Sequence, residues 1–432
     1  MRTARNHVLR NLLTGWIIAS VGLASLASSP AALAAEPDRA RPNILFILAD
    51  QYRQDCVGTF GNRGIHTPNL DRLAKEGMRF DRAYAAQPVC SPNRGSILTG
   101  LYPHSHGVFE NNVPLPKTSK AMSEMLAPRG YDCGYFGKWH LVRRDAFETF
   151  PEYPNDGRGN NHYYGKGESK RYGVDVITED AIAFIRKQRS EPFYTYVSYY
   201  PPHPPFSVPE EYLERYKDVE DQEQRIYFAM CTKVDEAVGA LMAALDEEKL
   251  AENTLVVFTS DHGHNFKRRW NDHHKRLCYD TSALLPLIMR MPGAIPAGRR
   301  TDGLISSVDL TPTILSLAGQ PVPDGLEGQN LSDLARGKTQ QGRRYVFIEN
   351  IPYPFKPEQG NERCVFDGEW KLILSTKRAP ELMNVKQDPA EKDNRYPSMK
   401  DSPVVRRLRE QLAKWARETK DDLAPELLKA LR

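Results

Sequence analysis

The sequence predicts an α/β fold, in which a large, mainly parallel doubly wound sheet is flanked by helices and followed by a small C-terminal α+β subdomain. Two uninterrupted apolar runs, at residues 43–49 and 254–259, are typical of parallel strands that are buried on both faces. Helical patterns alternate with such runs along most of the chain, which favours a parallel sheet. After about residue 343 the alternation changes to short strands and one amphipathic helix.

The individual elements follow from start and stop signals in the sequence. Residues 67–77 show the pattern for helices, because Thr67 is a suitable N-cap, Pro68 fits the first helical position and Gly77 follows the end. By the same criteria we expect strands at 131–136, 193–199 and 285–291, helices near 119–127, 178–188, 221–245 and 309–317, and, in the subdomain, strands at 345–349 and 363–374 and a helix at 404–418.

The N-terminal segment predicts export of the chain. Three arginines precede an apolar run at 16–26, and the small residues at 32–35 offer a cleavage site, which is typical of a secretory signal peptide. We therefore expect residues 1–35 to be removed, a large domain at 36–342 and a small subdomain at 343–432. The mature protein would be periplasmic or extracellular. No cysteine follows the cleavage region, so no lipid membrane anchor is expected.

The composition excludes some classes of partner. With 40% hydrophobic and 26% charged residues among 432, the chain resembles an ordinary globular protein. The formal net charge of +4 falls to +1 without the three arginines of the signal peptide. A global basic field for nucleic acid is therefore not predicted, and an anionic ligand would have to be attracted by local clusters.

One stretch, residues 89–100, carries the most specific signal. It contains the pattern C-x-P-x-R with Cys90, Pro92 and Arg94. Pro92 suits the first turn of a helix, which places Cys90 at a helix N-terminus, where free N–H groups favour negative charge. The pattern alone fits either a reactive or a structural thiol. The chain has 6 cysteines and no C-x-x-C pair, so modification of Cys90 would leave at most two disulfides.

Polar side chains follow both of the apolar strands. Asp50 and Gln51 end the first, and Asp261 and His262 come directly after the segment that contains the second. Each pair alone is typical of a polar loop. The carboxyl ends of parallel strands, however, are where α/β sheets gather ligands. Carboxylate and amide oxygens with one imidazole suit a hard cation such as Ca²⁺ or Mg²⁺.

Residues 89–100 closely resemble the signature of the type I, formylglycine-dependent sulfatases of the alkaline phosphatase superfamily. The resemblance implies that a formylglycine-generating enzyme oxidises Cys90 to formylglycine (3-oxoalanine), whose hydrate attacks a sulfate monoester. It also implies that Asp50, Gln51, Asp261 and His262 bind Ca²⁺, or Mg²⁺. The family usually has a second aspartate at the position of Gln51, so this site has one negative charge fewer.

The resemblance extends over about 42–394 and supplies further roles. The stretch 137–141 looks like the second family signature. It implies that Lys138 contacts sulfate oxygens and that His140 is the base that releases sulfate from the hemiacetal. His203, in a proline-rich loop, resembles the histidine that protonates the leaving alcohol. Lys275 looks like the second sulfate-binding lysine, and Arg94 would hold the nucleophile.

A basic, histidine-rich segment near the second strand end contains all but one of the remaining candidates; the exception is Asn112, which follows the stretch 102–108. It is interpreted either as a solvated loop or as a wall that attracts an anionic substrate. The expected substrate is a small sulfate ester or a sulfated glycan. The candidate substrate-binding residues are Asn112, His264, Arg268, His273 and His274.

Two rival functions stay open on the sequence. The Asp50-Gln51 pair also resembles phosphonate monoester hydrolases, so a phosphonate monoester or phosphodiester hydrolase of the same superfamily is the nearer alternative. A catalytically silent glycan-binding homologue is the more distant one. The complete set of chemical groups argues against it, because binding alone does not require all of them.

Overall fold

The computed structural model describes residues 41–143, 145–151, 153, 162–165, 170–266, 275–351 and 360–429. Residues 40–432 belong to one compact unit. The predicted signal peptide at 1–35 lies outside the described residues, so it stays a prediction. None of the described helices is both long and apolar enough to cross a membrane.

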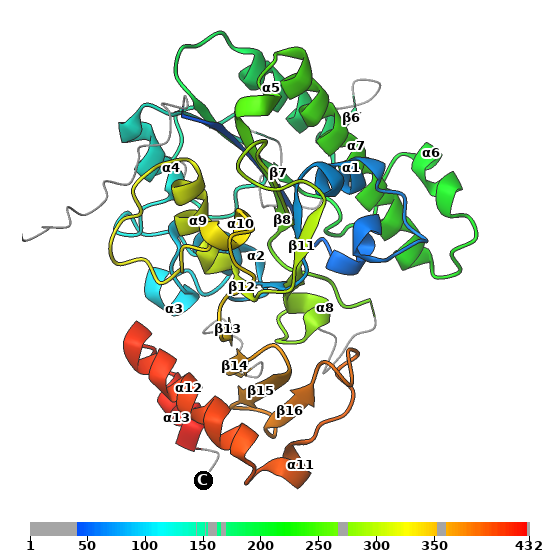
Figure 1. The fold of residues 1–432 in the computed structure, drawn as a ribbon. Helices are drawn as coiled ribbons and strands as arrows, with labels where there is room; N and C mark the ends of the chain where they lie inside the picture. The colour runs from blue at the N-terminus through cyan, green and yellow to red at the C-terminus, as the bar shows by residue number, and fades with distance from the viewer. Residues whose placement is uncertain are drawn as a thin grey trace, which may run out of the picture. The chain divides into compact units, whose positions relative to one another are not determined.

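A seven-stranded sheet forms the centre of the fold (Figure 1). Its strand order is β11-β2-β10-β8-β1-β7-β4, and every strand except β10 runs in the same direction. The predicted parallel doubly wound sheet is therefore confirmed. The strands are β1 (Asn43–Ala49), β2 (Met78–Phe80), β4 (Asp132–Gly137), β7 (Phe193–Tyr199), β8 (Thr254–Ser260), β10 (Leu287–Arg290) and β11 (Arg299–Thr301).

Helices cover both faces of this sheet. Successive residues of β1 point to opposite faces, so that Leu45 and Ile47 join one hydrophobic cluster and Ile44 and Phe46 the other. The apolar runs are continuous because both faces are buried. The first cluster includes α1 (Pro68–Glu76), α5 (Gly173–Arg186) and α7 (Gln222–Glu247), and the second includes α2 (Cys90–Thr99), α4 (Met122–Leu126), α9 (Leu310–Leu317) and α10 (Ser332–Ala335).

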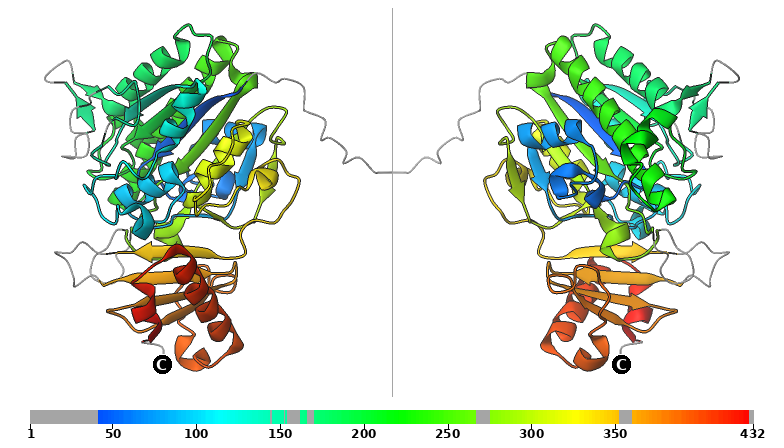
Figure 2. Two further views of the ribbon diagram at one scale, coloured as in Figure 1. Left: turned by 90° about the vertical axis from the view of Figure 1, so that its left-hand side faces the viewer. Right: turned by 90° about the vertical axis from the view of Figure 1, so that its right-hand side faces the viewer.

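The C-terminal part is an antiparallel sheet with helices on one face, as Figure 2 shows in orange and red. The apolar side of α12 contributes Val405, Leu408 and Leu412, which pack with Val365 and Leu372 of the sheet. The expected C-terminal α+β subdomain is therefore present. Its elements are β13 (Val346–Asn350), β14 (Glu362–Phe366), β15 (Trp370–Ser375), β16 (Glu381–Asn384), α11 (Tyr396–Met399), α12 (Pro403–Thr419) and α13 (Ala424–Lys429).

Two expected strands are divided in the structure. The stretch 363–374 forms β14 and β15, because the chain turns at Gly368, whose φ of 93° favours glycine. The stretch 285–291 is divided at Pro286 into β9 (Leu284–Leu285) and β10. Proline has no N–H to donate to a ladder, and here the chain leaves a three-stranded sheet of β12 (Ile305–Ser306), β3 (Ala83–Tyr84) and β9 for the main one.

Candidate active site

The carboxyl ends of four adjacent strands carry most of the predicted site. β8, β1, β7 and β4 are parallel neighbours, so their ends meet at one edge of the sheet. The residues that follow these ends are Asp261 and His262, then Asp50 and Gln51, then the loop to His203, and then Lys138 and His140. Gln51 and Asp261, which are 210 residues apart in sequence, are thereby brought to one place.

The helix α2 presents Cys90 to this edge. Val89 is extended and Cys90 is the first helical residue, with Pro92 in the first turn, as predicted. The helix ends at Gly100, whose φ is 72°. Close packing holds α2 in position, because a Cβ atom on Gly95 would lie 2.7 Å from the ring of His106. The thiol of Cys90 is fully buried.

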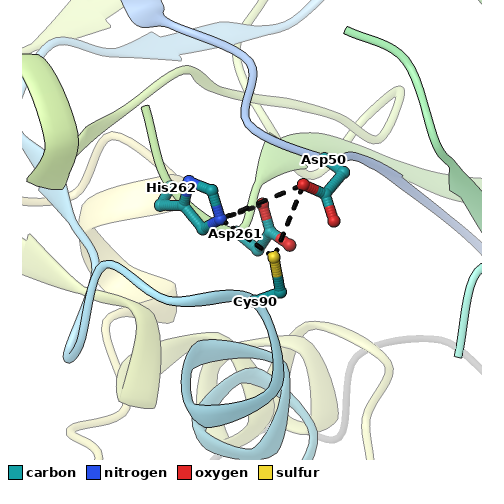
Figure 3. A group of neighbouring side chains, drawn as sticks. All are labelled: Asp50, Cys90, Asp261 and His262. Carbon is teal, nitrogen blue, oxygen red and sulfur yellow. Dashed lines mark hydrogen bonds and ion pairs between the residues drawn. The ribbon is translucent and has the colours of Figure 1, made fainter. Parts of the chain in front are cut away.

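Four side chains converge beside the start of α2 (Figure 3). One potential ligand atom from each of Asp50, Cys90, Asp261 and His262 lies within 4.8 Å of all the others. Cys90 Sγ is 3.2 Å from His262 Nε2 and 3.6 Å from Asp50 Oδ1. In a processed protein, formylglycine oxygen would take the place of this sulfur. Burial and the neighbouring Asp50 carboxylate raise the pKa of Asp261 to about 6, so the two acids together favour a cation.

Two buried cations balance these carboxylates. Arg94 Nη2 donates to Asp50 Oδ2 and Arg94 Nε donates to Asp261 Oδ2, each at 2.9 Å. Lys138 Nζ lies 2.5 Å from the same oxygen of Asp50 and 3.8 Å from Cys90 Sγ. Burial would lower the pKa of Lys138, but Asp50 raises it above its ordinary value, so the ammonium group stays charged. Removing Arg94 would leave Asp261 without its guanidinium partner, whereas Asp50 would keep Lys138.

A second group of side chains approaches Cys90 from another direction. Lys275 Nζ is 3.1 Å from Cys90 Sγ and 3.3 Å from His203 Nε2. His203 Nδ1 is 2.6 Å from the carbonyl oxygen of Pro204. A carbonyl only accepts, so Nδ1 carries the proton and Nε2 accepts from Lys275. Burial and then Lys138 lower the pKa of His203 to about 4, which keeps this imidazole neutral at pH 7.

The electrostatics at Cys90 favour an anion. Burial would raise the pKa of the thiol, but Lys138, Lys275 and His262 lower it well below its ordinary value. A hydrogen bond to His140 acts in the same direction. Burial and Lys138 lower the pKa of His140 itself, so its ring is suited to accept a proton. The site can therefore stabilise a negatively charged nucleophile and a negatively charged substrate group.

Two of the five candidate substrate-binding residues, His264 and Asn112, lie among the described residues. His264 is fully buried behind Gln51, with its Nδ1 2.6 Å from Gln51 Nε2. Asn112 is exposed in a turn at a φ of 64°, and its neighbour Asn111 accepts the backbone N–H of Ser91 in α2. Arg268, His273 and His274 lie outside the described residues.

Sequence reasoning missed Asn93, the second variable position of the C-x-P-x-R pattern. Its Nδ2 donates to the carbonyl oxygen of Asp261 at 2.6 Å, and its Oδ1 accepts from Ala86 N and Ser307 Oγ. Asn93 thereby ties α2 to the end of β8. A buried amide inside a helix, where asparagine is disfavoured, was the available signal.

Comparisons with known proteins identify the family of the chain. The profile of the family described as "Sulfatase" matches residues 42–320, and that of "N-sulphoglucosamine sulphohydrolase, C-terminal" matches 267–418. The chain is 33% identical over 356 residues to an ulvan-active sulfatase of Formosa agariphila, covering 72% of this chain and 68% of the relative.

Solved structures are also similar. The crystal structure of a sulfatase candidate, YidJ from Bacteroides fragilis, has a TM-score of 0.78 and 28% identity, and covers 92% of this chain and all of that one. A phosphonate monoester hydrolase of Agrobacterium radiobacter has a TM-score of 0.76 and 25% identity, with 88% of this chain and 96% of that one covered. The sulfatase profile matches more than half of this chain. The chain is therefore a member of the sulfatase family and a hydrolase of sulfate esters.

Proposed function

We propose that the protein is an exported sulfatase that removes sulfate from a sulfated carbohydrate, using formylglycine made from Cys90 and a bound Ca²⁺ ion. The observation that carries the proposal is the convergence of three buried metal-ligand candidates, Asp50, Asp261 and His262, and of two lysines on Cys90. The formylglycine mechanism is general in the family, and a maturation enzyme would have to act on Cys90 before folding buries it. The glycan substrate is supported by the ulvan-active relative.

The residues that would hold the cation are Asp50, Gln51, Asp261 and His262. Their oxygen-rich set fits a hard ion, and the two carboxylates repel each other without one. Ca²⁺ is the first choice because it accepts irregular oxygen ligation, and Mg²⁺ is the second. When bound, the ion would polarise the sulfuryl oxygens and favour the deprotonated nucleophile.

The lysines supply the remaining positive charge. Lys138 and Lys275 approach the nucleophile from two directions, so their ammonium groups can offset the charge on the sulfuryl oxygens in the transition state. The family resemblance implies that His203 protonates the leaving alcohol and that Lys275 assists in this protonation. In this geometry His203 Nε2 accepts from Lys275, so Lys275 is the member that carries the proton. His140 would then take the hydroxyl proton of the hemiacetal sulfate, which regenerates the aldehyde and expels sulfate.

A substrate panel tests the proposal. Formylglycine-bearing protein is loaded with Ca²⁺ or Mg²⁺ and assayed on an aryl sulfate, sulfated mono- and polysaccharides, a phosphodiester and a phosphonate monoester. We expect the highest kcat/KM on a sulfated sugar. A higher kcat/KM on the phosphonate would instead favour the second candidate function, which Gln51 and the phosphonate hydrolase neighbour support. Binding of glycans without turnover of any ester would contradict both.

The expected cellular location is tested separately. The signal peptide predicts that the mature chain begins near residue 36 outside the cytoplasm. N-terminal sequencing of protein from the periplasm or medium of an expressing bacterium checks this. An intact N-terminus found only in the cytoplasm would contradict export without affecting the proposed reaction.

A further inference from the structure

The side chain of Gln51 contacts His264, which in turn contacts Glu223. Gln51 Nε2 lies 2.6 Å from His264 Nδ1, and His264 Nε2 lies 3.0 Å from Oε1 of Glu223, in the first turn of α7. The imidazole is fully buried and stacks on the ring of Tyr227, with centroids 5.4 Å apart and planes 18° apart. The hydroxyl of Tyr227 donates to the carbonyl oxygen of Gln51 at 2.6 Å. The position of the ring is thus fixed by packing.

This chain of contacts determines which way the amide of Gln51 is turned. An ionised carboxylate only accepts hydrogen bonds, so Glu223 requires the proton of His264 on Nε2. In the neutral imidazole the other ring nitrogen, Nδ1, is then an acceptor, as its 2.6 Å contact with Gln51 Nε2 requires. Gln51 must present its NH₂ group to that nitrogen, and its Oε1 is left for the opposite side. The reverse orientation would turn N–H groups toward the cation site, where they would repel a positive ion.

We propose that Glu223 and His264 are positioning residues that orient the Gln51 amide so that its oxygen faces the cation. The inference rests on the cation binding proposed above. Such an arrangement suits a glutamine ligand in particular. A carboxylate has an oxygen on each side and needs no orientation, whereas an amide has only one. Partners behind metal ligands commonly fix ligand orientation in this way.

A double-mutant cycle on the full-length, metal-stripped protein tests the inference, with Ca²⁺ affinity measured by calorimetry. The variants are Glu223→Gln, Gln51→Glu and the double variant. Glu223→Gln removes the carboxylate and can donate to His264 Nε2, which allows the amide of Gln51 to turn. The matched control is Glu220→Gln, which removes the same charge from an exposed side chain three residues earlier.

We expect Glu223→Gln to weaken Ca²⁺ binding by about ten-fold or more, and the control to leave it unchanged. In the Gln51→Glu background the same substitution should have no larger effect than the control. An equal loss in both backgrounds would show that only charge is involved and would overturn the inference, as would undiminished affinity of Glu223→Gln. Absence of Ca²⁺ binding by the unmutated protein would overturn the cation site itself, and the inference with it.

Discussion

The ammonium group of Lys275 lies 3.1 Å from the sulfur of Cys90, although 185 residues separate the two in sequence. The same group lies 3.3 Å from His203 Nε2. Lys275 therefore contacts both the nucleophile position and the residue that the family resemblance assigns to the leaving group. Its removal should affect the chemical step more than substrate binding.

We expect Lys275→Met to lower kcat by about 10²–10³-fold, the usual effect of removing one charged or hydrogen-bonding group from a developing anion. Steady-state kinetics on an activated aryl sulfate measure this. The formylglycine content of each preparation is checked by mass spectrometry, so that poor maturation is not mistaken for poor catalysis. A matched control is Lys420→Met, on the surface of the C-terminal subdomain. Equal activity of Lys275→Met and the control would remove Lys275 from the mechanism.

Arg94 is also a structural element of the site. Its side chain is 1% exposed and is paired with Asp50 and Asp261, which are fully buried. Replacing it by the similarly long methionine leaves Asp261 without its guanidinium partner and Asp50 with Lys138 alone, so we expect Arg94→Met to lower the free energy of unfolding by about 3–5 kcal/mol. Urea denaturation measures the change, and added Ca²⁺ should restore part of it.

The control for Arg94 is an exposed pair. Arg72 is 51% exposed and pairs with Glu76 one turn along α1. Arg72→Met should lower the free energy of unfolding by less than about 1 kcal/mol. If both variants were equally stable, the buried ion pairs of Arg94 would not be needed to balance the acids.

His104 connects the large domain to the C-terminal subdomain. Its Nδ1 is 2.6 Å from Glu349 Oε1 in β13, and its Nε2 is 3.1 Å from the carbonyl oxygen of Thr419. Burial would lower the pKa of His104, but Glu349 raises it above the ordinary value. A folded-state pKa that is raised stabilises the fold fully below the unfolded pKa of about 6.5, and this contribution disappears as pH rises through the folded pKa.

We therefore expect the stability difference between the unmutated protein and His104→Gln to be greatest in mildly acidic solution and to shrink as pH rises. Urea denaturation at a series of pH values measures it. A difference that stays constant across that range, or grows with pH, would show that the charged pair does not contribute.

A serine at position 90 should trap the reaction halfway. Its hydroxyl can attack sulfur and displace the alcohol, but the resulting sulfate ester has no second hydroxyl to expel sulfate. We expect Cys90→Ser protein to gain one sulfuryl group on that side chain after exposure to substrate, as seen by peptide mass spectrometry, while Cys90→Ala gains none. Repeated turnover by the serine variant would contradict the need for an aldehyde.

The sequence predicted the strand-end residues well, for a physical reason. Asp50 and Asp261 follow apolar runs, and parallel strands necessarily bring their carboxyl ends together. The helix start at Cys90 could also be predicted from the sequence, because Pro92 marks the first turn. The antiparallel direction of β10 in the main sheet could not be predicted, because an apolar run does not indicate in which direction its strand runs.

Side-chain direction was the other limit. His264 lies two residues after His262, yet its ring is buried against Tyr227 and Gln51 and faces Glu223 of α7. The orientation of this histidine side chain depends on packing with a helix that is distant in sequence, so residue spacing cannot predict it. The tautomer of His203, set by the carbonyl of Pro204, was hidden for the same reason.

The proposed reaction depends on the conversion of Cys90 to formylglycine. The most direct measurement is mass spectrometry of the tryptic peptide 83–94 from protein made in a host that is able to form formylglycine. We expect a peptide that is lighter by the mass difference between thiol and aldehyde and whose aldehyde reacts with a hydrazine reagent. An unmodified thiol from that competent host would contradict this conversion.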